Sequence, residues 1–64
     1  MKIIKVTAEG EQEVLRIPQS RQENWQNILW CYAEYHNYKC DIGKGAVTMD
    51  CGNGEVRKWL FLGR

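Results

Sequence analysis

Apolar residues recur at two different spacings along this chain, and the change of spacing divides it into elements. Before residue 18 and after residue 37, apolar and polar positions largely alternate between clusters of turn residues, which is typical of strands. Between these parts, residues 20–37 carry apolar positions at a period of about 100° per residue, which is typical of a helix. The pattern therefore predicts one helix with strands on both sides of it.

The predicted helix covers residues 20–37. Ser20 and Glu23 have the spacing of a capping box, and Asn37 tolerates the left-handed conformation that often follows a helix. One arc of the helix is apolar and is expected to be buried. Its members are Trp25, Ile28, Leu29, Tyr32, Ala33 and Tyr35, with His36 at the end. Trp30 lies outside this arc, on the polar side, so it is a candidate exposed contact residue.

Five strands are predicted around this helix, at residues 1–8, 12–17, 38–43, 46–51 and 55–62. The order β-β-α-β-β-β defines a single α+β domain over residues 1–64. We expect an antiparallel sheet of four to five strands with the helix packed on one face. The pattern leaves open whether the two hairpins join in one sheet or stay apart around the helix.

The first hairpin is expected to turn at residues 10–11, through a two-residue loop. This loop places Val6 opposite Leu15 and Ile4 opposite Ile17, so that the apolar residues share one face. The register of the last hairpin is predicted from its turn in the same way.

Residues 53–54 are Asn-Gly, the strongest short hairpin signal. A two-residue loop there places Cys51 opposite Val56, and the more aliphatic face of this hairpin is expected to meet the helix. Because side chains alternate along a strand, Trp59 and Phe61 are then expected on the open face of the sheet.

This open face is predicted to be the functional surface. Large exposed aromatic rings beside arginine are the usual chemistry of interface hot spots. If both hairpins join one sheet, the face carries Ile3, Lys5, Val14, Arg16, Arg57, Trp59 and Phe61. The predicted partner-binding residues are Trp59, Phe61, Arg57, Arg16 and Lys5, with Trp30 as a separate contact on the helix.

Charge and composition narrow the kinds of partner. The net charge is +1, and acidic and basic residues are interspersed along the chain. We therefore expect no extended positive potential that would attract nucleic acid or an anionic membrane. Single-stranded nucleic acid is the alternative partner, since bases could stack on the rings while Lys5, Arg16 and Arg57 follow the phosphates. A third alternative is a homo-oligomer through the aromatic face, which would also help a 64-residue chain with a small core.

The three cysteines are expected to be free thiols, because their number is odd and no signal peptide is apparent. The same observations predict a cytoplasmic protein. Cys31, His36, Cys40 and Cys51 could form a Cys₃His zinc site, but their spacing matches no zinc pattern, and neither a metal nor another cofactor is expected. If Gly45-Ala46 formed the loop between the third and fourth strands, Cys40 would face Cys51 and a disulfide would be geometrically feasible.

Residues with catalytic potential have no evident partners, so we do not expect an enzyme. In coarse element order the chain is similar to many small phage-encoded proteins that block host enzymes or defence complexes. That resemblance implies a protein-binding module, such as an inhibitor of phage or mobile-element origin. It is a similarity of architecture and implies no site residues.

Overall fold

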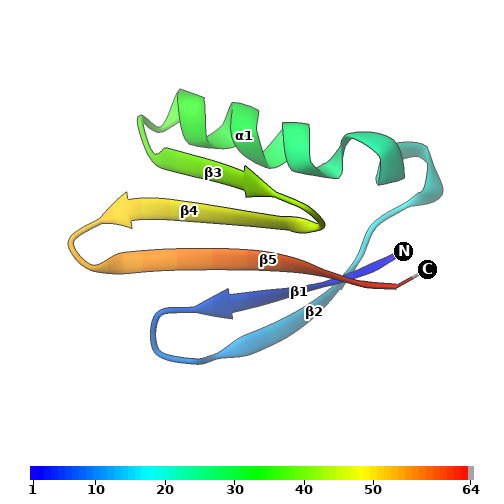
Figure 1. The fold of residues 1–64 in the computed structure, drawn as a ribbon, viewed down its shortest axis with the longest axis horizontal. Coiled ribbons are helices and arrows are strands. Elements are labelled where there is room, and N and C mark those ends of the chain that lie inside the picture. The colour runs from blue at the N-terminus through cyan, green and yellow to red at the C-terminus, as the bar shows by residue number, and fades with distance from the viewer. Residues whose placement is uncertain (64) are drawn as a thin grey trace.

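A computed structural model describes residues 1–63, without the side chains of residues 19, 22 and 23, and contains five strands and one α-helix (Figure 1). The elements are β1 Lys2–Thr7, β2 Gln12–Arg16, the 3-10 helix η1 Gln19–Asn24, α1 Trp25–Tyr35, β3 Lys39–Gly43, β4 Ala46–Gly52 and β5 Glu55–Gly63. The predicted α+β fold and its element order are confirmed.

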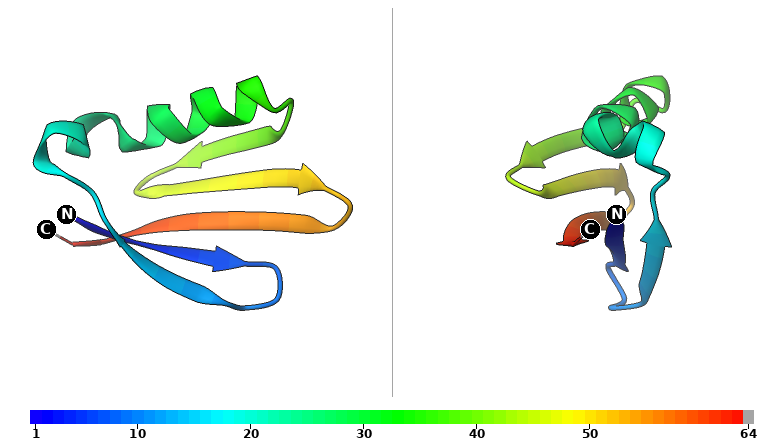
Figure 2. Two further views of the ribbon diagram at one scale, coloured as in Figure 1. Left: turned by 180° about the vertical axis from the view of Figure 1, so that it is seen from behind. Right: turned by 90° about the vertical axis from the view of Figure 1, so that its right-hand side faces the viewer.

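All five strands belong to one antiparallel sheet in the order β2-β1-β5-β4-β3. The two hairpins therefore join through β1 and β5, which settles the alternative that the sequence pattern left open. The first and last strands are central, whereas β2 and β3 form the edges. The segment containing α1 crosses from one edge of the sheet to the other (Figures 1 and 2).

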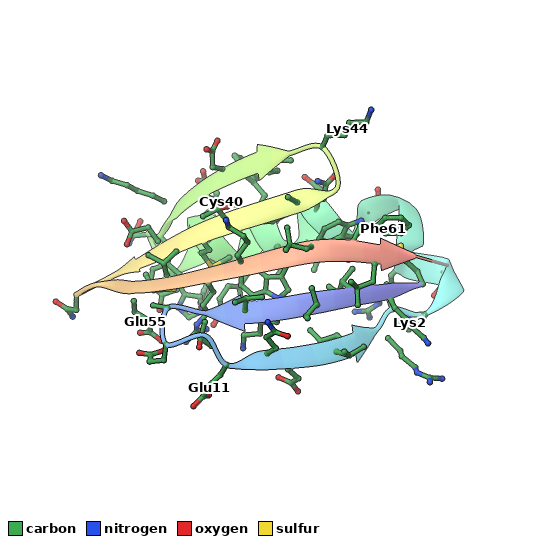
Figure 3. All side chains as sticks on the ribbon, turned by 60° about the horizontal axis from the view of Figure 1, so that its bottom comes forward. Lys2, Glu11, Cys40, Lys44, Glu55 and Phe61 are labelled. Carbon is green, nitrogen blue, oxygen red and sulfur yellow. The ribbon has the colours of Figure 1, made fainter. Side chains whose placement is uncertain are left out.

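The helix covers only part of one side of the sheet, here called the helix side. Among the strands, α1 makes its contacts with β3 and β4 (Figure 2). The Gln26 amide holds it there, donating hydrogen bonds to the carbonyl oxygens of Gly43, at 2.8 Å, and Ala46, at 3.0 Å. The other side, here called the open side, faces the viewer in Figure 3, with the helix behind the sheet.

The core lies between α1 and the helix side of the sheet. Its buried members come from the helix and from three central strands, and they are Ile3, Trp25, Ala33, Val47, Met49 and Trp59. Partly buried residues pack around them, including Met1, Leu15, Ile17, Leu29, Tyr38, Cys40 and Cys51.

The predicted start of the α-helix is wrong by five residues. Residues 19–24 form a 3-10 helix, in which the Arg21 amide donates to the Pro18 carbonyl at 2.9 Å in the tighter three-residue pattern. The α-helix begins at Trp25, and no side chain caps it at Asn24. The predicted capping box involves the Glu23 side chain, which lies outside the described residues.

The predicted register of the first hairpin is also wrong. Its loop is residues 8–10, with Gly10 at φ 86° and the Thr7 amide bonded to the Glu11 carbonyl at 2.9 Å. A three-residue loop with glycine in the left-handed conformation is a common hairpin form. Ile3 therefore lies opposite Leu15, and Ile4 opposite Val14.

In the last hairpin the predicted turn is present, but the predicted register fails one residue beyond it. Asn53 and Gly54 both have positive φ, at 55° and 76°, as a two-residue hairpin turn requires, and Gly52 pairs with Glu55. A β-bulge then intervenes, so that Asp50 rather than Cys51 lies opposite Val56. Beyond the bulge, Val47 faces Trp59, and the side chains of β5 lie on the side opposite to the one predicted.

The β3–β4 hairpin excludes the alternative register that would bring two cysteines together. Gly43 pairs with Ala46, so Lys44-Gly45 is the loop and Cys40 lies opposite Met49. Cys40 and Cys51 are free thiols in this structure, as is Cys31.

Candidate functional site

The structure does not bring the predicted partner-binding residues together on one face. Trp59 is 6% exposed and belongs to the core, so its predicted place on an open face is wrong. Lys5 lies opposite Trp59, and Arg57 and Phe61 are each two residues from Trp59 along β5, so all three lie on the helix side with it. Arg16 is exposed on the open side.

Trp30 is exposed, as expected, but its surroundings differ from the prediction. It follows Gln26 by four residues, about one helical turn, and Gln26 is bonded to the β3–β4 hairpin. This side of α1 therefore faces β3 and not solvent alone. Trp30 belongs to α1, whereas Arg57 belongs to β5 and Lys5 to β1.

The part of the helix that the structure exposes is half of the arc predicted to be buried. Trp25 and Ala33 are buried, but Tyr32 is 43% exposed and Tyr35 is 84% exposed. Among the strands, α1 contacts β3 and β4, and the exposed half of its arc is not buried against the sheet. Sequence reasoning missed this surface because it expected the whole apolar arc of the helix to be buried against the sheet.

The chain turns back at the end of α1, and several aromatic rings lie together there. Asn37 has a φ of 58°, as predicted for a residue that ends the helix. Its amide donates to the Glu34 carbonyl at 3.2 Å, and the Tyr38 amide donates to the Ala33 carbonyl at 2.8 Å. These two bonds form a Schellman motif, which turns Tyr38 back onto the last helical turn.

Four rings consequently pack together, and we call them the tyrosine cluster: Tyr32, Tyr35, His36 and Tyr38. The His36 ring is central. It stacks on Tyr38 with centroids 5.3 Å apart and an interplanar angle of 15°, and lies 4.3 Å from the centroid of Tyr32. Tyr35 meets His36 edge to face at 5.1 Å. Offset and edge-to-face pairs at these distances are favourable arrangements.

A charged pair on β5 lies near this cluster. The Arg57 guanidinium donates to a Glu55 carboxylate oxygen at 2.9 Å. This bond is the main reason why the pKa of Arg57 is raised, and the Cys51 thiol and the Tyr32 phenol make smaller contributions. Arg57 is therefore a permanent cation close to Tyr32.

A shallow polar hollow of about 250 Å³ borders the same end of the helix, lined by Asn37, Lys39, Asp50, Cys51 and Gly52. The Asp50 carboxylate accepts a hydrogen bond from the Gly52 amide at 2.9 Å. This side-chain bond spans the bulge between β4 and β5, so Asp50 has a structural role. The hollow adds polar groups to the margin of the tyrosine cluster.

The remaining chemical candidates do not assemble into a reactive site. Among the side chains that the structure describes, no three His, Cys, Asp or Glu residues lie close enough together to hold a metal ion. Burial raises the pKa of the Cys40 thiol, and Asp41 and Glu34 raise it further, so this thiol is poorly suited to act as a nucleophile.

Known proteins give no independent guide to this surface. The chain matches no protein-family model, no curated protein and no solved structure. In the part of the chain that the structure describes, neither helix has the length and apolar character needed to cross a membrane.

Proposed function

We propose that this protein is a small non-enzymatic protein-binding module and that the tyrosine cluster is its contact surface. The observation that supports this proposal is the exposure of Tyr32 and Tyr35 in a group of four aromatic rings that pack around His36. The buried core includes none of the four. Tyrosine rings provide a large contact area at a small entropic cost, and tyrosine and arginine are enriched in interface hot spots.

The charges around the cluster indicate the chemistry of the partner. Glu34 is in the last turn of α1, Glu55 holds Arg57, and Asp50 borders the adjacent hollow. The carbonyl end of the helix adds a partial negative charge at the same place. Because Arg57 and Lys39 lie beside these acidic groups, the expected partner surface combines apolar groups with side chains of both charges.

The proposal also covers the cellular location of the module, its genetic origin and the kind of protein that it acts on. An inhibitor or modulator of a host protein, encoded by a phage or mobile element and acting in the cytoplasm, fits a chain of this size and architecture. The support for this finer role is the coarse architecture alone, and the contact surface does not depend on it.

The structure does not assemble the platform required by the nucleic-acid alternative. That alternative needs Lys5, Arg16 and Arg57 on one face with exposed rings. Arg16 lies on the open side and the other two lie on the helix side, while Trp59 is buried. The aromatic face proposed for a homo-oligomer lies on the helix side of β5, where Phe61 is exposed but Trp59 is buried in the core. We therefore favour a protein partner at the tyrosine cluster.

Photo-crosslinking tests this contact surface directly, because it links a chosen residue to the protein that lies against it. A photoreactive phenylalanine analogue is placed at Tyr35, within the cluster, and separately at Lys44, an exposed residue in the β3–β4 loop. Crosslinking is carried out in the cells that normally contain the protein. We expect a discrete heteromeric adduct from position 35 and none from position 44, because the partner covers only the cluster.

A Tyr32→Ala substitution in the position-35 variant provides the control for specificity. It removes a neighbouring ring and is expected to reduce the yield of this adduct at least tenfold, since hot-spot rings contribute about 2 kcal/mol or more. Equal adducts from positions 35 and 44, or an adduct that Tyr32→Ala leaves unchanged, would contradict the proposal.

A further inference from the structure

The outer edge of β2 is an unprotected strand edge. β2 pairs with β1 on one side, and no other strand of residues 1–63 lies on its other side (Figure 1). Edge strands are usually protected by lysine, proline, a bulge or a covering element. β2 reads QEVLR, pairs with β1 without a register shift, and exposes 56% of Val14 at its centre. The other edge, β3, begins with Lys39 and has α1 packed against it.

The hydrogen bonds of the first hairpin show which backbone groups of β2 face outward. The Thr7 amide bonds to the Glu11 carbonyl, and the Ile17 amide bonds to the Met1 carbonyl, both at 2.9 Å. In an antiparallel pair, residues that bond to the partner strand alternate with residues that do not. Odd-numbered residues of β2 therefore bond to β1. The amides and carbonyls of residues 12, 14 and 16 point away from the sheet.

We infer that β2 of one copy pairs antiparallel with β2 of a second copy, with the two-fold axis at Val14. The two five-stranded sheets then form one continuous sheet. In this register Val14 faces Val14 of the second copy, and Gln12 faces Arg16 in both directions. All three outward-facing residues are paired, and each pair exchanges two hydrogen bonds.

The neighbouring registers are less favourable. An axis at Glu13 places two like charges directly opposite each other and leaves an outward-facing residue of each strand beyond the paired segment. An axis at Leu15 sets Gln12 against Pro18, which has no amide hydrogen to donate. The axis at Val14 is the one that satisfies every outward-facing group of β2.

The open side of the sheet supports the same register. A row of apolar side chains crosses it from β2 to β4, because Val14 lies opposite Ile4, Ile4 opposite Leu60, and Leu60 opposite Ala46. With the axis at Val14 this row continues into the second copy without interruption. The exposed Val14 side chain then packs against its symmetry mate.

Charge complementarity favours this antiparallel arrangement. Glu11 and Glu55 lie toward one end of the sheet, whereas Lys2 and Lys44 lie toward the other (Figure 3). Antiparallel pairing of β2 places the end of one copy that carries Glu11 beside the end of the second copy that carries Lys2. Glu11 is then opposite Ile17, between Arg16 and the segment that leads to Arg21.

Proline substitution distinguishes pairing at this edge from any other association. Val14→Pro removes an outward-facing amide but none of the bonds to β1, and proline is tolerated on the solvent side of edge strands. Val14→Thr keeps the amide and is the control. By sedimentation equilibrium we expect wild type and Val14→Thr at twice the 7.5 kDa chain mass, and Val14→Pro at 7.5 kDa.

Residue-resolved amide exchange provides the second measurement. The amides of Gln12, Val14 and Arg16 should become protected as protein concentration rises, whereas those of Glu13 and Leu15 should be protected at every concentration. If Val14→Pro does not fold, the mass of Gln12→Pro by sedimentation equilibrium and these exchange rates decide whether two copies pair through β2. A wild-type monomer at millimolar concentration, or a dimer whose Val14 amide exchanges freely, would overturn the inference. Neither result bears on the tyrosine cluster, which lies on α1 and the residues just after it.

Discussion

Two aromatic residues, Trp59 and Tyr35, show how the role of a single side chain in this protein depends on the direction in which it points. The sequence pattern predicts Trp59 on the surface, whereas the residue is 6% exposed in the core. The same pattern predicts a buried Tyr35, whereas the residue is 84% exposed. Residue type could not separate these outcomes, because both rings are large and partly polar. The structure assigns Trp59 to stability and leaves Tyr35 available for binding.

Substitution of each ring by alanine should separate these roles. Trp59→Ala removes a buried indole, which typically costs about 3–5 kcal/mol, a large share of the stability of a domain this small. Tyr35→Ala removes an exposed ring and should change the free energy of unfolding by no more than about 0.5 kcal/mol. Urea denaturation followed by circular dichroism measures both values. Similar losses for the two variants would mean that Tyr35 is structural.

At the scale of elements, what the sequence predicts well is the order of strands and helix and the position of turns. The Asn53-Gly54 turn and the end of the helix at Asn37 both follow from local backbone preference, and both are confirmed. The side of the sheet to which each strand directs its residues was not predictable in the same way. It depends on whether an odd or even number of residues lies between paired positions, and a single bulge reverses it.

The candidate site was missed for a related reason. A helical arc of apolar residues indicates a buried face only where another element lies beneath it. Here α1 makes its strand contacts with β3 and β4, and Tyr32 and Tyr35 are left exposed. No local feature of the sequence shows how much of a sheet one helix covers. The sequence pattern did not predict the location of the charged pair Arg57–Glu55 either, because that location depends on the bulge.

The bulge itself should be sensitive to backbone conformation at Gly52. Its φ of 86° is unfavourable for any residue with a Cβ atom, although no atom within 4 Å would clash with one. Gly52→Ala is therefore expected to lower the free energy of unfolding by about 1–2 kcal/mol through backbone strain alone.

Gly43→Ala is the matched control for this prediction. Gly43 has no positive φ, and an added Cβ atom would meet only Ala46, at an ordinary 3.9 Å. The control should be neutral or slightly stabilising, because alanine reduces the entropy of the unfolded chain. Thermal unfolding followed by circular dichroism compares the two. If Gly52→Ala were as stable as wild type, the bulge would not depend on the left-handed conformation of Gly52.

At the scale of the whole molecule, the main question is what holds one helix in place over half of a sheet. The buried apolar contacts of Trp25 and Ala33 attract the helix but do not specify its position along β3 and β4. Gln26 does specify it, since one amide bonds to carbonyls on both sides of the Lys44-Gly45 loop. The position of the helix in turn decides which half of its arc is exposed.

Gln26→Ala should therefore both weaken the fold and loosen the presentation of the tyrosine cluster. Two hydrogen bonds are lost, one of them partly buried, so we expect a loss of about 1–3 kcal/mol in the free energy of unfolding. Asn27→Ala, one residue along and exposed, is the control and should stay within about 0.5 kcal/mol of wild type. Chemical denaturation measures the stabilities, and amide exchange of α1 reports how firmly the helix is held. Faster exchange throughout α1 in Gln26→Ala alone would show that this contact positions the helix. Equal exchange in both variants would mean that apolar packing is sufficient, and that the half-covered sheet follows from the shape of the core.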